Sequence, residues 1–318
     1  MMNIVLDSCQ RVVLHSQHVS LDEEVLVCFA RQLIEMGLKP PRWEPRYHFS
    51  GTTERMAHYL LLLDALNFCF WPEPRWTVSY QGETLNGYWA LATSLKRAFE
   101  VDRILDDLEQ FATMTEEKLK RILDGTNEIP LLNERAQILR ELGQVLSERF
   151  EGRAINLFEA ADGSAARLIQ LLTEHFSSFR DEAVYDGRKV CFYKRAQILA
   201  ADLHGAFGGE GLGRLGDLDQ LTAFADYKLP QVLRHLGILR YDKDLNARID
   251  AKELIPAGSA EEIEIRAHTV WAVERIRQEL ERLSVSARAF EIDWMLWNLG
   301  QKDEFRAKPY HRTLTIYY

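Results

Sequence analysis

Asp226 has the setting in which a carboxyl group becomes a catalytic acid or base. It follows an aromatic and apolar run and precedes a Lys-Leu-Pro step, in the stretch TAFADYKLPQVLRHLGIL of residues 222–239. Apolar residues recur there every three or four positions, which is typical of a packed helix interrupted near Pro230. At such a break a carboxylate can face a cavity and keep hydrogen-bond partners, which suits a group whose pKa must be tuned. The alternative is that Asp226 caps the helix after the break.

A second acid, Asp293, lies among Phe290, Trp294 and Trp297. Partial removal of water by such neighbours raises the pKa of a carboxyl group and can keep it protonated. The sequence therefore offers a second candidate acid in an apolar environment.

Lys194 and Arg195 open a predicted helix, a position that the helix dipole disfavours for a cation. A nearby anion would explain Lys194, either a substrate phosphate or a catalytic carboxylate. The alternative is a solvated surface charge. Further cationic candidates for phosphate binding are Arg266, His268, His311 and Arg312. These four can equally tie the C-terminal segment to the helix that carries Trp271.

Aromatic residues cluster in two short segments, LNFCFWP at 66–72 and NGYWAL at 86–91, each with polar neighbours. Core packing is the ordinary role of such residues. Flat bases, however, are held by stacking on aromatic faces, and Asn or Asp recognises their edges. Upstream, prolines force an extended stretch, PPRWEPRYHF at 40–49, which is expected to expose His48 and Phe49 to a neighbouring cavity.

Helical periodicity dominates the chain, so the predicted fold class is mainly α. Ser20 is the expected N-cap of a helix that ends at Gly37, and further helices are expected at 53–68, 88–111, 115–124, 131–149 and 163–179. Gln-Gly and Asp-Gly turns predict small hairpins at 75–87 and 182–193, and the β-branched, aromatic terminus predicts a closing strand. We expect one compact domain over 1–318, with two lobes, 1–185 and 186–318.

Composition limits the classes of function. The 318 residues include 39 Lys or Arg and 48 Asp or Glu, a net charge of −9. An acidic chain is poorly suited to grip a polyanionic backbone, so a free nucleotide is favoured over nucleic acid as a partner. No apolar run is long enough to span a bilayer and the N-terminus lacks a signal-peptide pattern, so we expect a cytoplasmic protein without membrane contacts.

The sequence does not support a metal-binding or a cofactor-binding motif. The four cysteines form no CxxC pair, and the histidines form no HExxH motif. GLGRLG at 211–216 matches a dinucleotide fingerprint, but a helical pattern precedes it instead of a strand, which indicates a loop. We expect no metal and no cofactor.

Several segments resemble the queuosine salvage protein family, the queuosine 5'-phosphate N-glycosylases. Besides the two aromatic segments, they are FADYKLPQVLRHLGIL at 224–239, FYKRAQILAADL at 192–203, EEIEIRAHTVWAVE at 261–274, IDWMLWNLG at 292–300 and PYHRTLTIYY at 309–318. The resemblance spans nearly the whole chain, in order. It implies an all-helical fold related to the helix-hairpin-helix DNA glycosylases. It also implies hydrolysis of the bond between queuine, a 7-deazaguanine base, and the ribose of its nucleoside monophosphate.

The resemblance also implies roles for residues. Breaking an N-glycosidic bond builds oxocarbenium character on the ribose, which a carboxylate stabilises or attacks. We expect Asp226 at the ribose and Asp293 at the base edge or leaving group, or the reverse, with Lys194 a better catalytic candidate than Arg195. A 7-deazapurine has carbon at position 7, so hydrogen bonds to its other heteroatoms must help it leave. The expected substrate contacts are His48, Phe49, Asn67, Phe68, Trp71, Tyr88, Tyr227, Arg266 and His268.

On this basis 1–185 is the expected base-binding lobe and 186–318 the catalytic lobe of a glycosidase that needs no obligate protein partner. Two alternatives stay open. One is a nucleic-acid glycosylase or lesion-binding protein, which conflicts with the net charge of −9. The other is a non-catalytic protein that binds a queuine-type nucleoside, in which both acids would be surplus.

Overall fold

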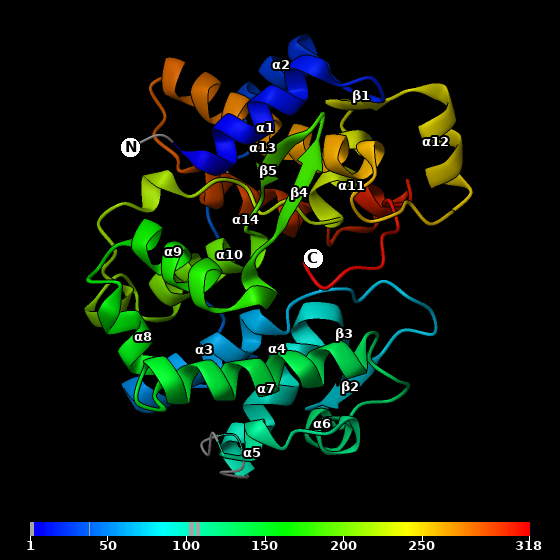
Figure 1. Cartoon of the computed structure of the whole chain (residues 1–318). Coiled ribbons are helices and arrows are strands. Elements are labelled where there is room, and N and C mark those ends of the chain that lie inside the picture. The colour runs from blue at the N-terminus through cyan, green and yellow to red at the C-terminus, as the bar shows by residue number, and fades with distance from the viewer. Residues whose placement is uncertain (1–2, 38, 102–104, 106–108) are drawn as a thin grey trace.

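The computed structural model describes residues 3–37, 39–101, 105 and 109–318. Helices make up most of this part of the chain, which confirms the mainly α prediction (Figure 1). The helices of the first half are α1 (Ile4–His15), α2 (Glu23–Glu35), α3 (Thr53–Ala65), α4 (Gly87–Val101), α5 (Glu109–Ala112), α6 (Glu116–Leu123), α7 (Leu132–Arg149), α8 (Ala154–Ala160) and α9 (Ala165–His175). The later helices are α10 (Lys194–Ala206), α11 (Lys228–His235), α12 (Lys243–Asp250), α13 (Ala260–Arg282) and α14 (Ala289–Leu299).

Within the described residues, six short strands form three antiparallel pairs. They are β1 (Val19–Leu21) with β6 (Leu239–Tyr241), β2 (Thr77–Tyr80) with β3 (Glu83–Asn86), and β4 (Glu182–Tyr185) with β5 (Arg188–Cys191). The two predicted hairpins are confirmed, because the turn residues at 81–82 and 186–187 all have the positive φ of a type I′ turn. The predicted loop at GLGRLG is also confirmed, since it holds only one 3-10 turn at Gly211–Gly213.

Three local expectations were wrong. Ser20 lies in β1 opposite Arg240, and Asp22 caps α2 instead, by accepting a hydrogen bond from the Val25 amide at 3.0 Å. The described residues 307–318 form no strand, and their one isolated β-bridge joins Arg312 to Leu254. Pro230 does not interrupt a helix but lies in the first turn of α11, where its missing N–H costs no hydrogen bond.

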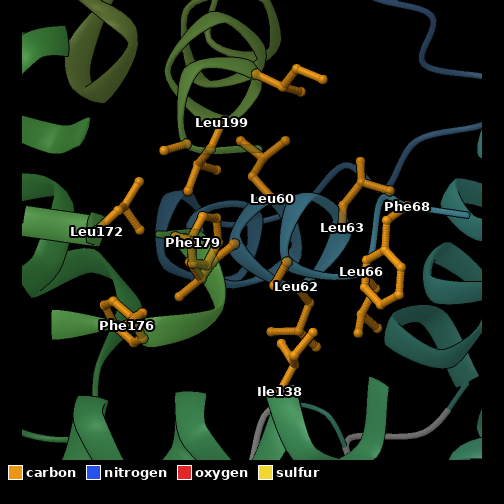
Figure 2. Close-up of a cluster of buried hydrophobic side chains, with 14 of the residues drawn as sticks. Leu60, Leu62, Leu63, Leu66, Phe68, Ile138, Leu172, Phe176, Phe179 and Leu199 are labelled. Carbon is orange, nitrogen blue, oxygen red and sulfur yellow. The ribbon is translucent and has the colours of Figure 1, made fainter. Parts of the chain in front are cut away.

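The centre of the fold is α3, in which every residue from Ala57 to Ala65 is buried. A helix that is apolar on all faces requires neighbours all round. In Figure 2, Leu60 lies toward Leu199 of α10, and Leu62 lies toward Ile138 of α7. The short LLLLDAL run is therefore a core helix. In the described part of the chain, no helix is both long and apolar enough to cross a membrane.

Two hydrophobic clusters divide the interior. The larger contains α3, α7 and α10, and the smaller is built from α2, α11, α13 and α14. The first helix, α1, packs on α13 near the other end of the chain (Figure 1). The clusters thus cut across the expected boundary at residue 185, and the division into a base-binding and a catalytic lobe stays a prediction.

Both candidate acids lie where the chain passes from one cluster to the other. Ala225 belongs to the larger cluster and Leu229 to the smaller, with Asp226 between them. Asp293 likewise follows Ile292 of the smaller cluster, on a helix that also contributes to the larger. The fold therefore positions the acids at the seam between its two cores.

We expect Leu62→Ala to lower the free energy of unfolding by about 2–5 kcal/mol, because it empties space at the centre of α3. The matched control is Leu14→Ala, at a side chain that is 72% exposed, which we expect to change stability by less than about 0.5 kcal/mol. Urea unfolding followed by circular dichroism measures both. Equal shifts in the two variants would contradict the central place of α3.

Candidate active site

A cleft between the two clusters consists of two adjoining cavities. The wider cavity, of about 470 Å³, is bounded by the 67–75 segment, β3, the start of α4 and the chain end at 306–318. The narrower cavity, of about 160 Å³, is bounded by the 41–48 segment, α10 and α14. The residues that line both are Asn67, Tyr88, Trp89, Lys194, Asp226 and Trp297. These shared residues define the junction of the two cavities.

Asp226 both caps a helix and faces the junction, so the two interpretations of this residue are compatible. Its Oδ1 accepts hydrogen bonds from the backbone amides of Lys228 at 2.8 Å and Leu229 at 2.9 Å, at the start of α11. Burial raises the pKa of Asp226, against the opposing effects of Lys194 and the two amides. A carboxylate held this way keeps one fixed orientation while it faces the cavities.

Lys194 is buried, so it is not the solvated surface charge that the sequence left open. Its Nζ donates a hydrogen bond to the Asn67 carbonyl oxygen at 2.9 Å. Burial lowers the pKa of Lys194 to about 8, while the acids Asp226, Asp64 and Asp293 act in the opposite direction. Three buried carboxyl groups therefore favour the charged form of Lys194.

Asp293, on α14, lines the narrower cavity. Its Oδ2 accepts a hydrogen bond from the Phe224 amide at 2.7 Å. Burial, and then the neighbouring charge of Asp226, raise the pKa of Asp293 well above its ordinary value. A raised pKa favours the protonated form of a carboxyl group, and in that form it can donate a hydrogen bond.

Aromatic side chains dominate the narrower cavity. Its lining includes Trp89, Trp294 and Trp297 as well as Trp43, which stacks on His48 with ring centroids 3.9 Å apart. Burial lowers the pKa of His48 to about 4, so its ring is neutral. The cavity thus offers flat apolar walls with a few buried polar groups, as small-molecule sites commonly do.

Cations gather in the wider cavity. Among the described residues that line it, six are cationic and only Glu73 and Asp226 are acidic. The cations are Arg75, Lys194, Lys228, Lys252, Arg306 and Arg312. Burial lowers the pKa of Lys228 to about 8, and the buried Nε of Arg312 has no hydrogen-bond partner among the described residues. This cavity suits a small anion.

The structure brings together nine of the twelve residues that the sequence singled out for catalysis or binding. They are His48, Asn67, Phe68, Trp71, Tyr88, Lys194, Asp226, Tyr227 and Asp293. Three lie elsewhere. Phe49 is buried against Tyr59 and Phe99, and His268 lines a separate cavity, where its Nε2 is 3.3 Å from the Ser16 hydroxyl. Arg266 lines neither of the two cavities.

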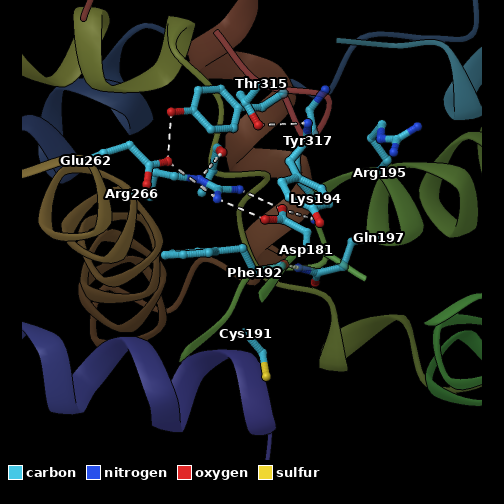
Figure 3. A network of polar contacts seen from close by, with 12 residues as sticks. Asp181, Cys191, Phe192, Lys194, Arg195, Gln197, Glu262, Arg266, Thr315 and Tyr317 are labelled. Carbon is cyan, nitrogen blue, oxygen red and sulfur yellow. Dashed lines mark hydrogen bonds and ion pairs between the residues drawn. The ribbon is translucent and has the colours of Figure 1, made fainter. Parts of the chain in front are cut away.

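Arg266 forms a buried ion pair with Asp181, drawn in Figure 3. Its guanidinium donates to both Asp181 oxygens, at 2.9 and 2.6 Å, and its Nε donates to the Ala225 carbonyl oxygen at 3.1 Å. Asp181 in turn accepts a hydrogen bond from the Lys194 amide at 3.2 Å. The pair therefore ties the backbone next to Asp226 to the first residue of α10.

The other cationic candidates also differ in whether they line the cleft. Arg312 lines the wider cavity. Arg195 is buried and donates to the Ala65 and Ser178 carbonyl oxygens, and His311 is buried beside Tyr318. Of the additional phosphate candidates, only Arg312 thus lies in the described lining of the cleft.

Four further residues of the cleft, Trp43, Trp89, Trp297 and Asp202, were not predicted as site residues from the sequence. A usable signal existed on α10, where Lys194, Ile198, Asp202 and Gly205 recur at intervals of four, four and three and line the narrower cavity together. Trp43 lies in an irregular segment, where no periodicity indicates which way a side chain points.

The fold and the cleft define a mainly helical protein with a nucleotide-sized site that contains buried acids and a buried lysine. The family model for queuosine salvage proteins matches residues 47–318. A Sphaerobacter thermophilus protein named queuosine 5'-phosphate N-glycosylase/hydrolase is 50% identical over 314 residues, which are 99% of this chain and 97% of the relative. Proteins of the same name from Dictyostelium discoideum and Mus musculus are 41% and 34% identical, over 85% and 98% of this chain and 80% and 98% of theirs. The chain belongs to the queuosine salvage protein family.

We expect Asp181→Asn to lower the free energy of unfolding by about 3–5 kcal/mol, because it removes the nearer charge partner of the buried Arg266 and leaves only Glu262, at 3.6 Å. The matched control is Glu23→Gln, which breaks the partly exposed pair with Arg275 and is expected to cost less than about 1 kcal/mol. Denaturant unfolding of both variants measures the difference. A cost for Asp181→Asn as small as that of the control would show that the buried pair is dispensable.

Proposed function

We propose that this protein hydrolyses the N-glycosidic bond of queuosine 5'-phosphate and releases queuine and ribose 5-phosphate, for salvage of queuine in tRNA modification. The observation that carries the proposal is the division of the cleft into an aromatic cavity and a basic cavity, with a carboxylate and a lysine at their junction. The names of the relatives support the same reaction and substrate.

Each part of the nucleotide has a matching part of the cleft. The base stacks in the narrower cavity, between walls that include Trp294 and Trp297. The phosphate lies among the cations of the wider cavity, which include Arg312. The ribose then lies at the junction, with its anomeric carbon next to Asp226.

The surroundings of the two acids separate their roles. Four influences favour the ionised form of Asp226, namely the charge of Lys194, the amides of Leu229 and Lys228, and the charge of Lys228. Asp293 is deeply buried and lies beside the charge of Asp226, so it is the neutral partner. Asp226 therefore stabilises or attacks the oxocarbenium-like ribose, or activates a water molecule. Asp293 donates a hydrogen bond to the departing base, whose position 7 is carbon and offers no site for a proton.

The same proposal places the protein in the cytoplasm and gives it a mononucleotide as its partner. Four free cysteines, three of them buried, suit the reducing conditions of a cytoplasm. The cations are enclosed in a cavity of a chain with net charge −9, which favours a mononucleotide over a nucleic acid.

Asp226→Asn is expected to reduce the release of queuine from queuosine 5'-phosphate by about 10²–10³-fold, because the charge that stabilises the transition state is lost. The fold is expected to persist, since the amide oxygen of Asn can still accept the two hydrogen bonds that cap α11. Chromatography of the products gives the rate. The control is Asp244→Asn, at an exposed residue of α12, which should retain the rate of the original protein. Full activity of Asp226→Asn, or no base release by the unaltered folded protein, would contradict the proposal.

Arg312→Met is expected to raise KM for queuosine 5'-phosphate by about 10–100-fold, the effect of one lost charge-assisted hydrogen bond. KM for unphosphorylated queuosine should change little, because that substrate places no anion in the wider cavity. Steady-state kinetics on both substrates provides the comparison, with the exposed Arg149→Met on α7 as the charge-matched control. A similar rise in KM for both substrates would argue against a phosphate site at Arg312.

A further inference from the structure

Gly205 is the residue at which the narrower cavity reaches the backbone of α10. It lies on the face of this helix that also carries Lys194, and both residues line the cavity. The indole rings of Trp43 and Trp294 line the same cavity. A Cβ atom built on Gly205 would lie 3.5 Å from Cη2 of Trp294 and 3.5 Å from Cε3 of Trp43. A side chain at this position would therefore enter the space that the two indole rings border.

The fold itself does not require glycine at this position. Gly205 lies in the last turn of α10, and its φ is outside the left-handed region, whereas Gly208 and Gly209 after the helix have φ of +61° and +77°. The added Cβ atom would meet the two rings at ordinary van der Waals distance, so alanine fits without displacing them. Glycine is also a poorer helix former than alanine, because it loses more conformational freedom on folding. Stability therefore favours alanine at position 205, and the glycine needs another reason.

Other aromatic rings support the two indole walls. Trp43 stacks on His48, with ring centroids 3.9 Å apart and an angle of 27° between the ring planes. Trp294 packs edge to face on Phe290, with ring centroids 5.1 Å apart. Moving either indole would break these contacts, and closely packed side chains resist such a shift. The room beside Gly205 is therefore fixed by rigid walls, and an added side chain would reduce it.

Resting on the proposed function, we propose that Gly205 sets the size limit of the base cavity. The edge of the bound 7-deazaguanine lies against the backbone of α10 at Gly205, in contact with the rings of Trp43 and Trp294. Glycine is the residue that lets a backbone approach a ligand this closely. Indole rings hold a flat base by stacking or by edge-to-face contact. The helix thus gives up the more stable alanine in exchange for room for the base.

Gly205 acts on the base alone in this arrangement. It lines the narrower cavity and not the wider one, which contains the cations. Asp226 lies at the junction, where the ribose is placed, and it comes from a different segment of the chain. A side chain at position 205 therefore obstructs the base and leaves the positions of the ribose and the phosphate open. Binding of the base and binding of the sugar phosphate should respond differently to it.

The test is a graded pair of substitutions, Gly205→Ala and Gly205→Val, in the intact protein. Isothermal titration calorimetry measures the binding of queuine, which is the base alone, and of ribose 5-phosphate, which is the sugar phosphate alone. One added carbon in a filled apolar pocket changes affinity by about 10–200-fold. The dissociation constant of queuine should therefore rise by at least about tenfold in Gly205→Ala, and further in Gly205→Val. The dissociation constant of ribose 5-phosphate should not change in either variant.

Urea unfolding and a matched glycine separate this role from a purely structural one. The unfolding midpoint of Gly205→Ala should be as high as that of the unaltered protein or higher, because alanine is the better helix former. The control is Gly216→Ala, at an exposed residue outside both cavities, where the nearest atom to the added Cβ is the Gly163 carbonyl oxygen at 3.9 Å. This variant should bind queuine like the unaltered protein. If Gly205→Val fails to fold, Gly205→Ala decides alone, because its methyl group fits at ordinary contact distance.

Three results would overturn the size limit. They are unchanged queuine affinity in a folded Gly205→Ala, an equal loss of affinity for queuine and ribose 5-phosphate, and failure of the unaltered protein to bind queuine. The outcome is separable from that of the proposed reaction. Queuine binding that Gly205→Ala weakens, without hydrolysis of queuosine 5'-phosphate, would overturn the reaction and support the size limit. Hydrolysis with a queuine affinity that Gly205→Ala leaves unchanged would overturn the size limit and leave the reaction standing.

Discussion

The buried ion pair between Asp181 and Arg266 is the constraint on which the geometry of the cleft depends. The Arg266 guanidinium lies between the rings of Phe192 and Tyr318, 3.9 and 4.4 Å from their centroids. It cannot shift without losing these contacts, and through Asp181 and the Ala225 carbonyl it holds the segments that carry the lysine and the central acid. Removing two charges from water costs free energy, which only close pairing and hydrogen bonding offset. The pair therefore joins the two hydrophobic clusters rigidly, at a cost in desolvation free energy.

Exclusion of water from the cleft shifts the pKa values of its acids and of its lysine together. The same burial raises the pKa values of Asp202, Asp226 and Asp293 and lowers that of Lys194. One lysine cannot compensate three neighbouring carboxylates in a region of low dielectric constant, so the charge must be reduced by binding protons. The backbone amides decide where those protons go, because Asp226 accepts two amide hydrogen bonds and Asp293 only one.

Local sequence was informative where the chain is periodic and less so where tertiary packing decides orientation. The helices expected at 53–68, 115–124 and 131–149 and the hairpins at Gly82 and Gly187 could be predicted, because apolar spacing and turn chemistry are local. The meeting of Asp226, Lys194 and Asp293 in one cleft depends on tertiary packing, and only the family resemblance led us to expect it. His48 and Phe49 are neighbours in an irregular segment, and only the packing of α3 and α4 shows that one faces the cleft and the other the core. Arg266 was assigned to substrate because its partner, Asp181, is remote in sequence.

The distribution of charge explains how an acidic protein can favour an anion. With a net charge of −9, the long-range field of the chain does not attract polyanions. The six cations of the wider cavity act at short range, within low-dielectric walls that concentrate their field on a small volume. A phosphate on a single nucleotide reaches that volume and gains the local attraction. A nucleic acid would leave most of its phosphates against the acidic exterior, where salt screens any remaining attraction within about 10 Å. The proposed selection of a mononucleotide therefore rests on the enclosure of positive charge in the wider cavity.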